Sequence, residues 1–181
     1  AGKLARIVDR NGNTVSLNYD TAGRLGGIVD DLGRSVTVAY DTAGRLASVT
    51  DFSTRTVSYL YDGNGDLVAC VSPPVTGTPN ENDFPNGKTN RYSYTSGSPA
   101  EAENHLLVAC EAALGQATAQ YGYDLDPASV SYLRCTSLQR GTAAPTMLTY
   151  QPQTPTPANR FATLRCIAND PVGNVTELLY D

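Results

Sequence analysis

Few residues in this chain could carry chemistry. The segment Asp62-Gly63-Asn64-Gly65-Asp66 places oxygen-bearing side chains at alternate positions, as the start of a calcium-binding loop does. The rest of that pattern is missing, because Leu67 stands at the glycine position and Pro73 at the closing glutamate position. The segment therefore predicts an ordinary turn, and we expect neither a metal ion nor a cofactor.

The cysteines form a second set of interest, which consists of Cys70, Cys110, Cys135 and Cys166. Their spacings do not match a Cys-x-x-Cys zinc pattern. Each is expected at the strand site that Ile28 and Val49 hold earlier in the chain. Two interpretations stay open: four buried small hydrophobic residues, or two disulfides, with Cys70–Cys110 and Cys135–Cys166 preferred among three pairings. Disulfides would imply an oxidising compartment.

Histidine chemistry has little support, because His105 is the only histidine. No serine or cysteine of the chain carries a nucleophile signature, so a catalytic triad is not indicated. We therefore expect a protein without enzymatic activity.

The overall composition excludes two classes of partner. The net charge is −5 and the only lysines are Lys3 and Lys88, so no basic patch for nucleic acid is expected. No apolar run approaches the roughly 20 residues that a membrane-spanning helix needs. The chain does not begin with Met and has no signal-peptide core, so we expect a processed chain or a part of a longer one.

The strongest signal is an internal repeat. The segment 19–25, Tyr-Asp-Thr-Ala-Gly-Arg-Leu, recurs without change at 40–46, 21 residues later, and a looser copy occupies 61–67. Self-similarity at a fixed period predicts a repeat architecture, in which each unit mainly packs on its neighbours.

Each unit contains the pattern of two strands and two turns. Val15, Leu17 and Tyr19 alternate with polar residues, which predicts a strand. The Asp-x-x-Gly segments that separate such strands are turn sequences, because Asp bonds turn amides and Gly supplies positive φ. The fold class predicted is all-β: an array of antiparallel β-hairpins forming a spiralling strip or tube.

The repeat positions are the candidate structural sites: Tyr19, Asp20, Gly23, Arg24, Tyr40, Asp41, Gly44, Arg45, Tyr61, Asp62, Gly65, Tyr123, Asp124, Tyr180 and Asp181. We expect the tyrosine rings to stack along the strip, each Asp to hold a turn, and Arg24 and Arg45 to pair with turn carboxylates. A ladder of tyrosine faces that binds sugar is the alternative function for these positions.

The chain is predicted to be one array over 1–181. Its parts are regular repeats (1–72), a loop (73–91), degenerate repeats (92–140), a second loop (141–159) and a terminal repeat (160–181). Helix propensity is high over 100–120, but Leu107-Val108-Ala109-Cys110 copies the strand sequence of 67–70. We therefore predict strand, turn and strand there.

The segment Tyr-Asp-x-x-Gly-Arg-Leu at this period resembles the YD repeat of Rhs proteins, of the C components of insecticidal toxin complexes, and of teneurins. The resemblance implies a β-hairpin strip that spirals into a shell or tube, which encloses a toxin polypeptide or presents an adhesive surface. Thr54 at a glycine position and Asp66 at the arginine position depart from the pattern. Asp170-Pro171-Val172-Gly173 resembles the self-cleavage region of some Rhs proteins, although its place in the repeat explains it as a turn.

The predicted function is a noncatalytic structural β-repeat module of a large secreted or cell-surface assembly, either a shell wall or a subunit of an extracellular fibre. The alternatives are an adhesion or carbohydrate-binding module, and a shell segment of an Rhs-type toxin-delivery protein. The expected partners are neighbouring repeats or further copies joined head to tail, and, in the adhesion alternative, a surface glycan. The expected location is extracellular or the cell surface.

Overall fold

The computed structural model describes residues 2–113 and 117–181. These residues divide into two compact units, one over 1–89 and one over 90–181. The single array over 1–181 stays a prediction.

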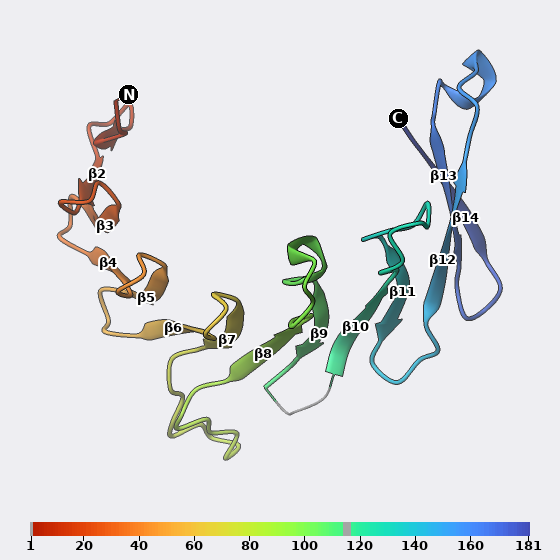
Figure 1. The fold of residues 1–181 in the computed structure, drawn as a ribbon. Helices are drawn as coiled ribbons and strands as arrows, with labels where there is room; N and C mark the ends of the chain where they lie inside the picture. Colours follow the sequence, from red (N-terminus) through yellow and green to blue (C-terminus); the bar gives the residue numbers. More distant parts are fainter. Residues whose placement is uncertain (1, 114–116) are drawn as a thin grey trace. The chain divides into compact units, whose positions relative to one another are not determined.

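The first unit is a series of antiparallel strands that follow one another in chain order (Figure 1). The strands are β1 (Arg6–Val8), β2 (Thr14–Tyr19), β3 (Leu25–Asp30), β4 (Ser35–Tyr40), β5 (Leu46–Thr50), β6 (Thr56–Tyr61) and β7 (Leu67–Val71). Each 21-residue period thus contributes two strands. The all-β class and the hairpin array predicted from the sequence are confirmed, whereas closure into a tube stays a prediction.

The sequence period is also the period of the strand register. In β2–β3 the residue facing Ile28 is Leu17, and one period later Val38 faces Val49. Both pairs are followed by a β-bulge, directly before Tyr19 and Tyr40 respectively. A bulge bends a strand and re-aims the next side chain, so each tyrosine of the repeat leaves its strand in the same way.

Turns of one design join these strands. In the first Tyr-Asp turn the amide of Asp20 donates to the carbonyl of Arg24 (2.8 Å), and the amide of Gly23 donates to the carbonyl of Asp20 (2.9 Å). Gly23 has φ of +79°, a conformation that costs glycine little and other residues more. Thr54 occupies the equivalent place in a later turn with φ of +65°, and its amide donates to Asp51 in the same way.

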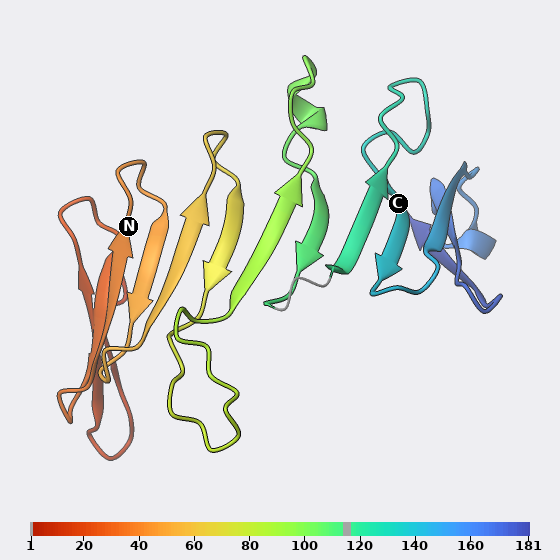
Figure 2. The same cartoon turned by 90° about the horizontal axis from the view of Figure 1, so that it is seen from below.

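A long connection follows β7. Residues 72–88 leave the strands as an arm, drawn in yellow-green in Figure 2, in which Val75 and Phe84 form an isolated bridge. The Lys88 ammonium lies 4.4 Å from the centre of the Phe84 ring. The sequence predicts a loop over 73–91, and the structure starts the next strand at Thr89.

The second unit repeats the antiparallel arrangement with longer connections. Its elements are β8 (Thr89–Tyr94), the short 3-10 helix η1 (Glu101–Glu103), β9 (Leu107–Glu111), β10 (Ala117–Tyr123), β11 (Cys135–Arg140), β12 (Thr146–Pro152), η2 (Pro157–Asn159), β13 (Leu164–Asn169) and β14 (Val175–Tyr180). The strand prediction for 100–120 is confirmed by β9 and β10, although 114–116 lie outside the described residues. Among the described helices, none is long and apolar enough to cross a bilayer.

The loop predicted over 141–159 is wrong over 146–152, because β12 occupies Thr146–Pro152. Pro145 and Pro152 lie just before and at the end of that strand, which are positions that proline tolerates. Between them, Tyr150 faces Cys166 in β13 as a regular ladder partner. The two prolines therefore mark the limits of the strand and do not prevent it from forming.

Burial is shallow throughout the described residues. The buried hydrophobic side chains are those of Ala69, Ala162, Leu164 and Cys166. Most other strand residues are half-buried, as expected of one sheet layer whose faces carry no second layer. Cohesion therefore comes mainly from contacts between consecutive strands.

The turn at Thr54 provides a test of the repeat. The variant Thr54→Gly should raise the free energy of unfolding by about 1 kcal/mol, because it relieves a β-branched residue held at positive φ. The matched control is Gly33→Thr. It should lower stability by at least about 1 kcal/mol, since a Cβ at Gly33 meets no atom within 4 Å and only the backbone conformation (φ +77°) opposes it. Urea unfolding measures both, and equal stability of Thr54→Gly and wild type would contradict the account.

Candidate functional site

The tyrosine of each regular repeat donates a hydrogen bond to the preceding repeat. The Tyr40 hydroxyl donates to the carbonyl oxygen of Leu25 at 3.0 Å, fifteen positions earlier. The same bond recurs in the neighbouring repeats, as Tyr19 to Leu4 (2.9 Å) and Tyr61 to Leu46 (3.0 Å). A half-buried tyrosine hydroxyl needs such a partner, so the bond sets the place of one repeat against the next.

A cation covers the same tyrosine ring. The guanidinium carbon of Arg24 lies 4.3 Å from the ring centre of Tyr40, and that of Arg45 lies 4.4 Å from Tyr61. Lys3 stands over Tyr19 at 5.0 Å. Such contacts contribute about 0.5–1 kcal/mol at exposed sites. Each tyrosine therefore holds the basic-Leu dipeptide of the preceding repeat, and we call this pair of interactions the inter-repeat contact.

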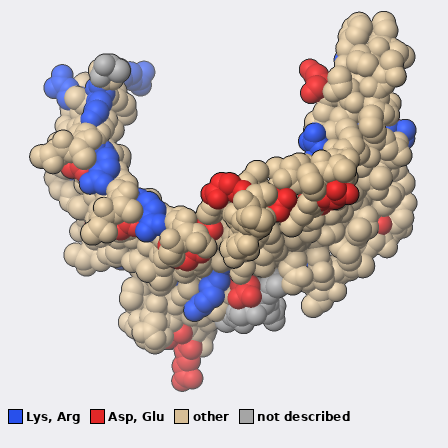
Figure 3. All heavy atoms as spheres, viewed as in Figure 1, with Lys and Arg blue, Asp and Glu red and all other residues tan. Residues whose placement is uncertain are grey.

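The aspartate of each Tyr-Asp turn fixes the arginine. Asp41 accepts the backbone amide of Arg45 on one carboxylate oxygen and its Nε on the other, both at 2.8 Å. Asp20 holds Arg24 in the same way, at 2.7 and 2.8 Å. These bonds keep the guanidinium plane over the next tyrosine. Figure 3 shows Lys and Arg side chains recurring along the visible face of the first unit, with acidic side chains beside several of them.

The hydrogen bonds of the Tyr-Asp turns also lower the pKa values of their aspartates. The backbone amide of Arg45, followed by its side chain, lowers the pKa of Asp41, and the amide of Arg24 does the same for the pKa of Asp20. Hydrogen bonds to the ionised carboxylate favour that form. The Asp20 and Asp41 carboxylates therefore stay ionised to a lower pH than an ordinary aspartate does.

The sequence of the second unit departs from the repeat, but its tyrosine hydroxyls still donate to backbone carbonyls of an earlier strand. The Tyr123 hydroxyl donates to Leu107 and that of Tyr150 donates to Cys135, each at 2.9 Å. Arg134 lies over the Tyr150 ring at 5.6 Å, which repeats the spacing between Arg24 and Tyr40. Burial, followed by the Cys166 thiol, raises the pKa of Tyr150 to about 12.

The remaining Tyr-Asp positions serve their own segments. Asp124 accepts a hydrogen bond from the Ser131 hydroxyl at 2.6 Å, within the long β10–β11 connection. Tyr180 faces Leu164 at the end of β14, and Asp181 follows it as an exposed residue.

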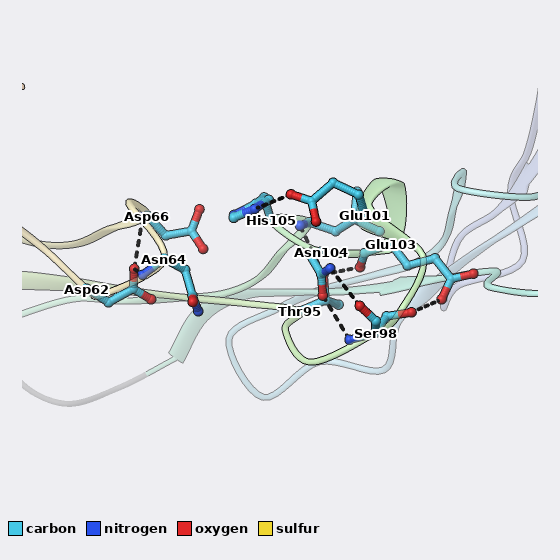
Figure 4. A network of polar contacts seen from close by, with 10 residues as sticks. Asp62, Asn64, Asp66, Thr95, Ser98, Glu101, Glu103, Asn104 and His105 are labelled. Carbon is cyan, nitrogen blue, oxygen red and sulfur yellow. Dashed lines mark hydrogen bonds and ion pairs between the residues drawn. The ribbon is translucent and has the colours of Figure 1, made fainter.

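The segment that resembles a calcium loop is a repeat turn. One carboxylate oxygen of Asp62 accepts the amides of Asn64 and Asp66, both at 2.9 Å, as drawn in Figure 4. Gly65 closes the turn at φ of +95°. Within the described residues, no cluster of three or more His, Cys, Asp or Glu side chains could hold a metal ion.

The β8–β9 connection contains the polar network of Figure 4. Ser98 donates its hydroxyl to Glu103 at 2.5 Å, and its amide donates to Asn104 at 3.0 Å. His105 lies 3.5 Å from Glu101 and adopts φ of +66°. These contacts join residues of the β8–β9 connection to one another and organise the loop.

The cysteines are free thiols in the structure, so the disulfides considered from the sequence are not formed. Cys135 lies in β11 and Cys166 in β13, with β12 between them. Two strand spacings amount to about 9.5 Å, beyond the roughly 6.8 Å that a disulfide allows between Cα atoms. Burial raises the pKa of the Cys135 thiol, which further lowers its reactivity.

The common cysteine site predicted from the sequence is also corrected. Cys70 faces Tyr59 one period after Val49 faces Val38, so Cys70 does occupy the Val49 site. Cys135 instead faces Tyr123, the relation that Leu46 has to Tyr40. Longer loops in the second unit shift the register, which simple alignment of strand sequences could not show.

The Asp170 carboxylate is held by hydrogen bonds within its own turn. Asp170 accepts the amide of Asn174 on one oxygen and the Asn174 side chain on the other, both at 2.7 Å. This is the bonding of Asp9 to Asn13 in the first turn of the chain. The Asp-Pro-x-Gly segment thus takes the ordinary place of a repeat turn.

Comparison with known families agrees with this geometry. The family model named RHS Repeat matches residues 19–56 and, overlapping, 40–74. Residues 19–74 are therefore similar to Rhs repeats. A search of curated proteins gives no match.

Two solved structures share the fold of this chain. They are the crystal structures of TcdB2-TccC3-Cdc42 (16% identity, TM-score 0.55) and of TcdB2-TccC3-TEV (14% identity, TM-score 0.50). Each match covers 98% of this chain but only 9% of the other, so the chain spans about a tenth of the length of those proteins. At these identities the likeness concerns the fold.

Sequence reasoning missed the inter-repeat contact, although the signal was present. Arginine and tyrosine recur sixteen positions apart as Arg24 and Tyr40, and again as Arg45 and Tyr61. The same interval separates Arg134 from Tyr150, and that interval alone would have indicated a strand at Tyr150.

Removing one tyrosine hydroxyl tests the contact. Tyr40→Phe should lower the free energy of unfolding by about 1 kcal/mol, because the hydrogen bond to Leu25 is lost while the ring stays under Arg24. The control Tyr59→Phe, on the same sheet but outside the Tyr-Asp segments, should change stability by no more than about 0.5 kcal/mol. Equal effects of the two variants in urea unfolding would refute the special role of Tyr40.

The turn carboxylates predict the response to acid. Because folding lowers the pKa of Asp20 and Asp41 below the ordinary value of 3.8, the unfolded chain binds more protons at low pH. The melting temperature should therefore stay nearly constant from about pH 7 to about pH 5 and fall below about pH 4. Thermal unfolding followed by circular dichroism measures this. Asp41→Asn should shrink the acid-induced fall, and an unchanged fall would contradict the assignment.

Proposed function

We propose that this chain is a noncatalytic wall segment of a large extracellular or cell-surface assembly built from Rhs repeats. The observation that carries the proposal is the inter-repeat contact. A tyrosine finds its hydrogen-bond acceptor and its cation only in the preceding repeat, as Tyr40 does in Leu25 and Arg24. A unit of this kind is a building element that needs neighbours.

The shape of each unit supports the same role. One layer of strands leaves large side chains exposed, among them Leu32 (75%) and Phe52 (57%). In a wall, further repeats extend the strip and cover strand edges that would otherwise stay open. The partners we propose are neighbouring repeats of a longer chain, or further copies arranged head to tail.

The structural relatives narrow the kind of assembly. The TcdB2-TccC3 proteins share the fold and are about ten times longer, so this segment corresponds to a small part of such a protein. Together with the Rhs resemblance, this favours the shell of a toxin-delivery protein over a fibre.

Sugar binding by a tyrosine ladder is less well supported. Arg24 and Arg45 lie over the rings of Tyr40 and Tyr61, at 4.3 and 4.4 Å. A sugar would have to displace these cations, which their own aspartates hold in place.

Electron microscopy of the longest natural polypeptide that contains this segment tests the proposal. We expect a hollow particle in which residues 2–113 and 117–181 form consecutive rungs of the wall. A segment that hangs outside the particle on a linker, or a solid globular particle, would overturn the assignment. A glycan array run on the same protein separates adhesion from wall formation, because specific binding that is lost in Tyr40→Ala would favour adhesion.

A further inference from the structure

The β12–β13 hairpin ends in an ordered tip that the repeat does not require. Beyond Pro152 the hairpin continues through a bond from the Gln153 amide to the Thr163 carbonyl (2.8 Å) and closes around η2 (Figure 1). Thr156 and Asn159 form a reciprocal capping box there, and the Asn159 side chain also donates to Thr154 at 2.9 Å. So many bonds in one turn hold its backbone in a single conformation.

The hydrogen-bonded hairpin tip presents two side chains whose backbone conformation is strained. Arg160 (φ +56°) and Phe161 (φ +63°) are consecutive left-handed residues, and neither is glycine. Phe161 is 62% exposed, whereas the next residue, Ala162, is 2% exposed. Strain that persists in a rigid frame and exposes an aromatic residue beside an arginine is typical of a binding element.

The first unit contains a hollow that is concave and acidic, whereas the hairpin tip is protruding and basic. It has a volume of about 480 Å³, and its apolar lining comes from Ile7, Val15 and Leu32. Three aspartates line it as well, Asp9, Asp30 and Asp31, against a single arginine, Arg34. Asn13 and Arg34 hold Asp9 and Asp30 in their turns, while the neighbouring Asp31 is exposed.

The tip and the hollow are complementary in charge, and the hollow has room for an aromatic ring. Residues 151–163 contain one arginine and no acidic residue, whereas the lining of the hollow has two more carboxylates than guanidinium groups. A cavity of about 150 Å³ already accommodates benzene, so a phenylalanine ring fits the hollow. We propose that Phe161 of one copy of this chain enters the hollow of a second copy, with Arg160 facing Asp31.

This contact goes beyond wall formation, because it joins one chain or particle to another. The donor and acceptor surfaces differ, so the contact is heterologous and each copy can both give and receive a tip. Its small area makes it transient, with a dissociation constant on the order of 0.1–1 mM.

Sedimentation velocity of the chain from about 10 µM to about 1 mM tests the proposal, and we expect the average sedimentation coefficient to rise with concentration. Phe161→Gly should weaken association about 10- to 100-fold while raising the melting temperature, because glycine relieves the left-handed strain. The control Val172→Ala removes another exposed side chain (83%) and should leave association unchanged.

Charge reversal tests the partner assignment. Arg160→Glu and Asp31→Arg should each weaken association about tenfold, and a chain carrying both changes should regain it. Chains that remain monomeric at the highest concentration would overturn the proposal, as would association that survives Phe161→Gly. Weakening by both single variants without recovery in the double variant would also reject the pairing of Arg160 with Asp31.

Discussion

The structure depends on the hydrogen bond from each repeat tyrosine to the leucine carbonyl of the repeat before it. The bond reaches back fifteen residues, across a whole hairpin, and the ring carries the cation of the same preceding repeat. Backbone ladders alone would tolerate slippage between strands that are rich in Val, Ser and Thr. A tyrosine that must find both a carbonyl and a guanidinium has one position, so the contact fixes the register of successive hairpins.

This contact explains how a chain with almost no buried core can be ordered. Ala69 is the only buried hydrophobic residue of the described part of the first unit. Stability in such an array is close to a sum over repeats and the interfaces between neighbours, so every interface matters and none dominates. Asp20 and Asp41 contribute by holding the arginines that reach into the next repeat. The turn and the interface are therefore one structural device.

Local sequence chemistry was sufficient for the regular part of the fold. Alternating Val15 and Leu17 predicted a strand, and the Asp-x-x-Gly turns follow from the bonding of Asp and the positive φ of Gly23. It failed at β12, which lies within the loop predicted over 141–159; Pro145 and Pro152 only mark the ends of that strand. The cysteine pairing failed for another reason, since distances across a sheet depend on how many strands intervene, and local patterns cannot count strands that they miss.

Residues other than glycine that adopt positive φ differ in what that conformation serves, which is chain connection at one site and binding at another. In the repeat turns of the described residues, positive φ falls mostly on glycines, where it serves connection alone. Thr54 is the exception within a regular turn. The hydrogen bonds that every such turn makes compensate for the conformational strain of Thr54. Arg160 and Phe161 are two consecutive exceptions, in a hairpin tip that joins no repeat to another. The connection between β12 and β13 does not require this backbone conformation, yet a capping box holds it. The conformation is best explained by the side chains that it presents to a partner.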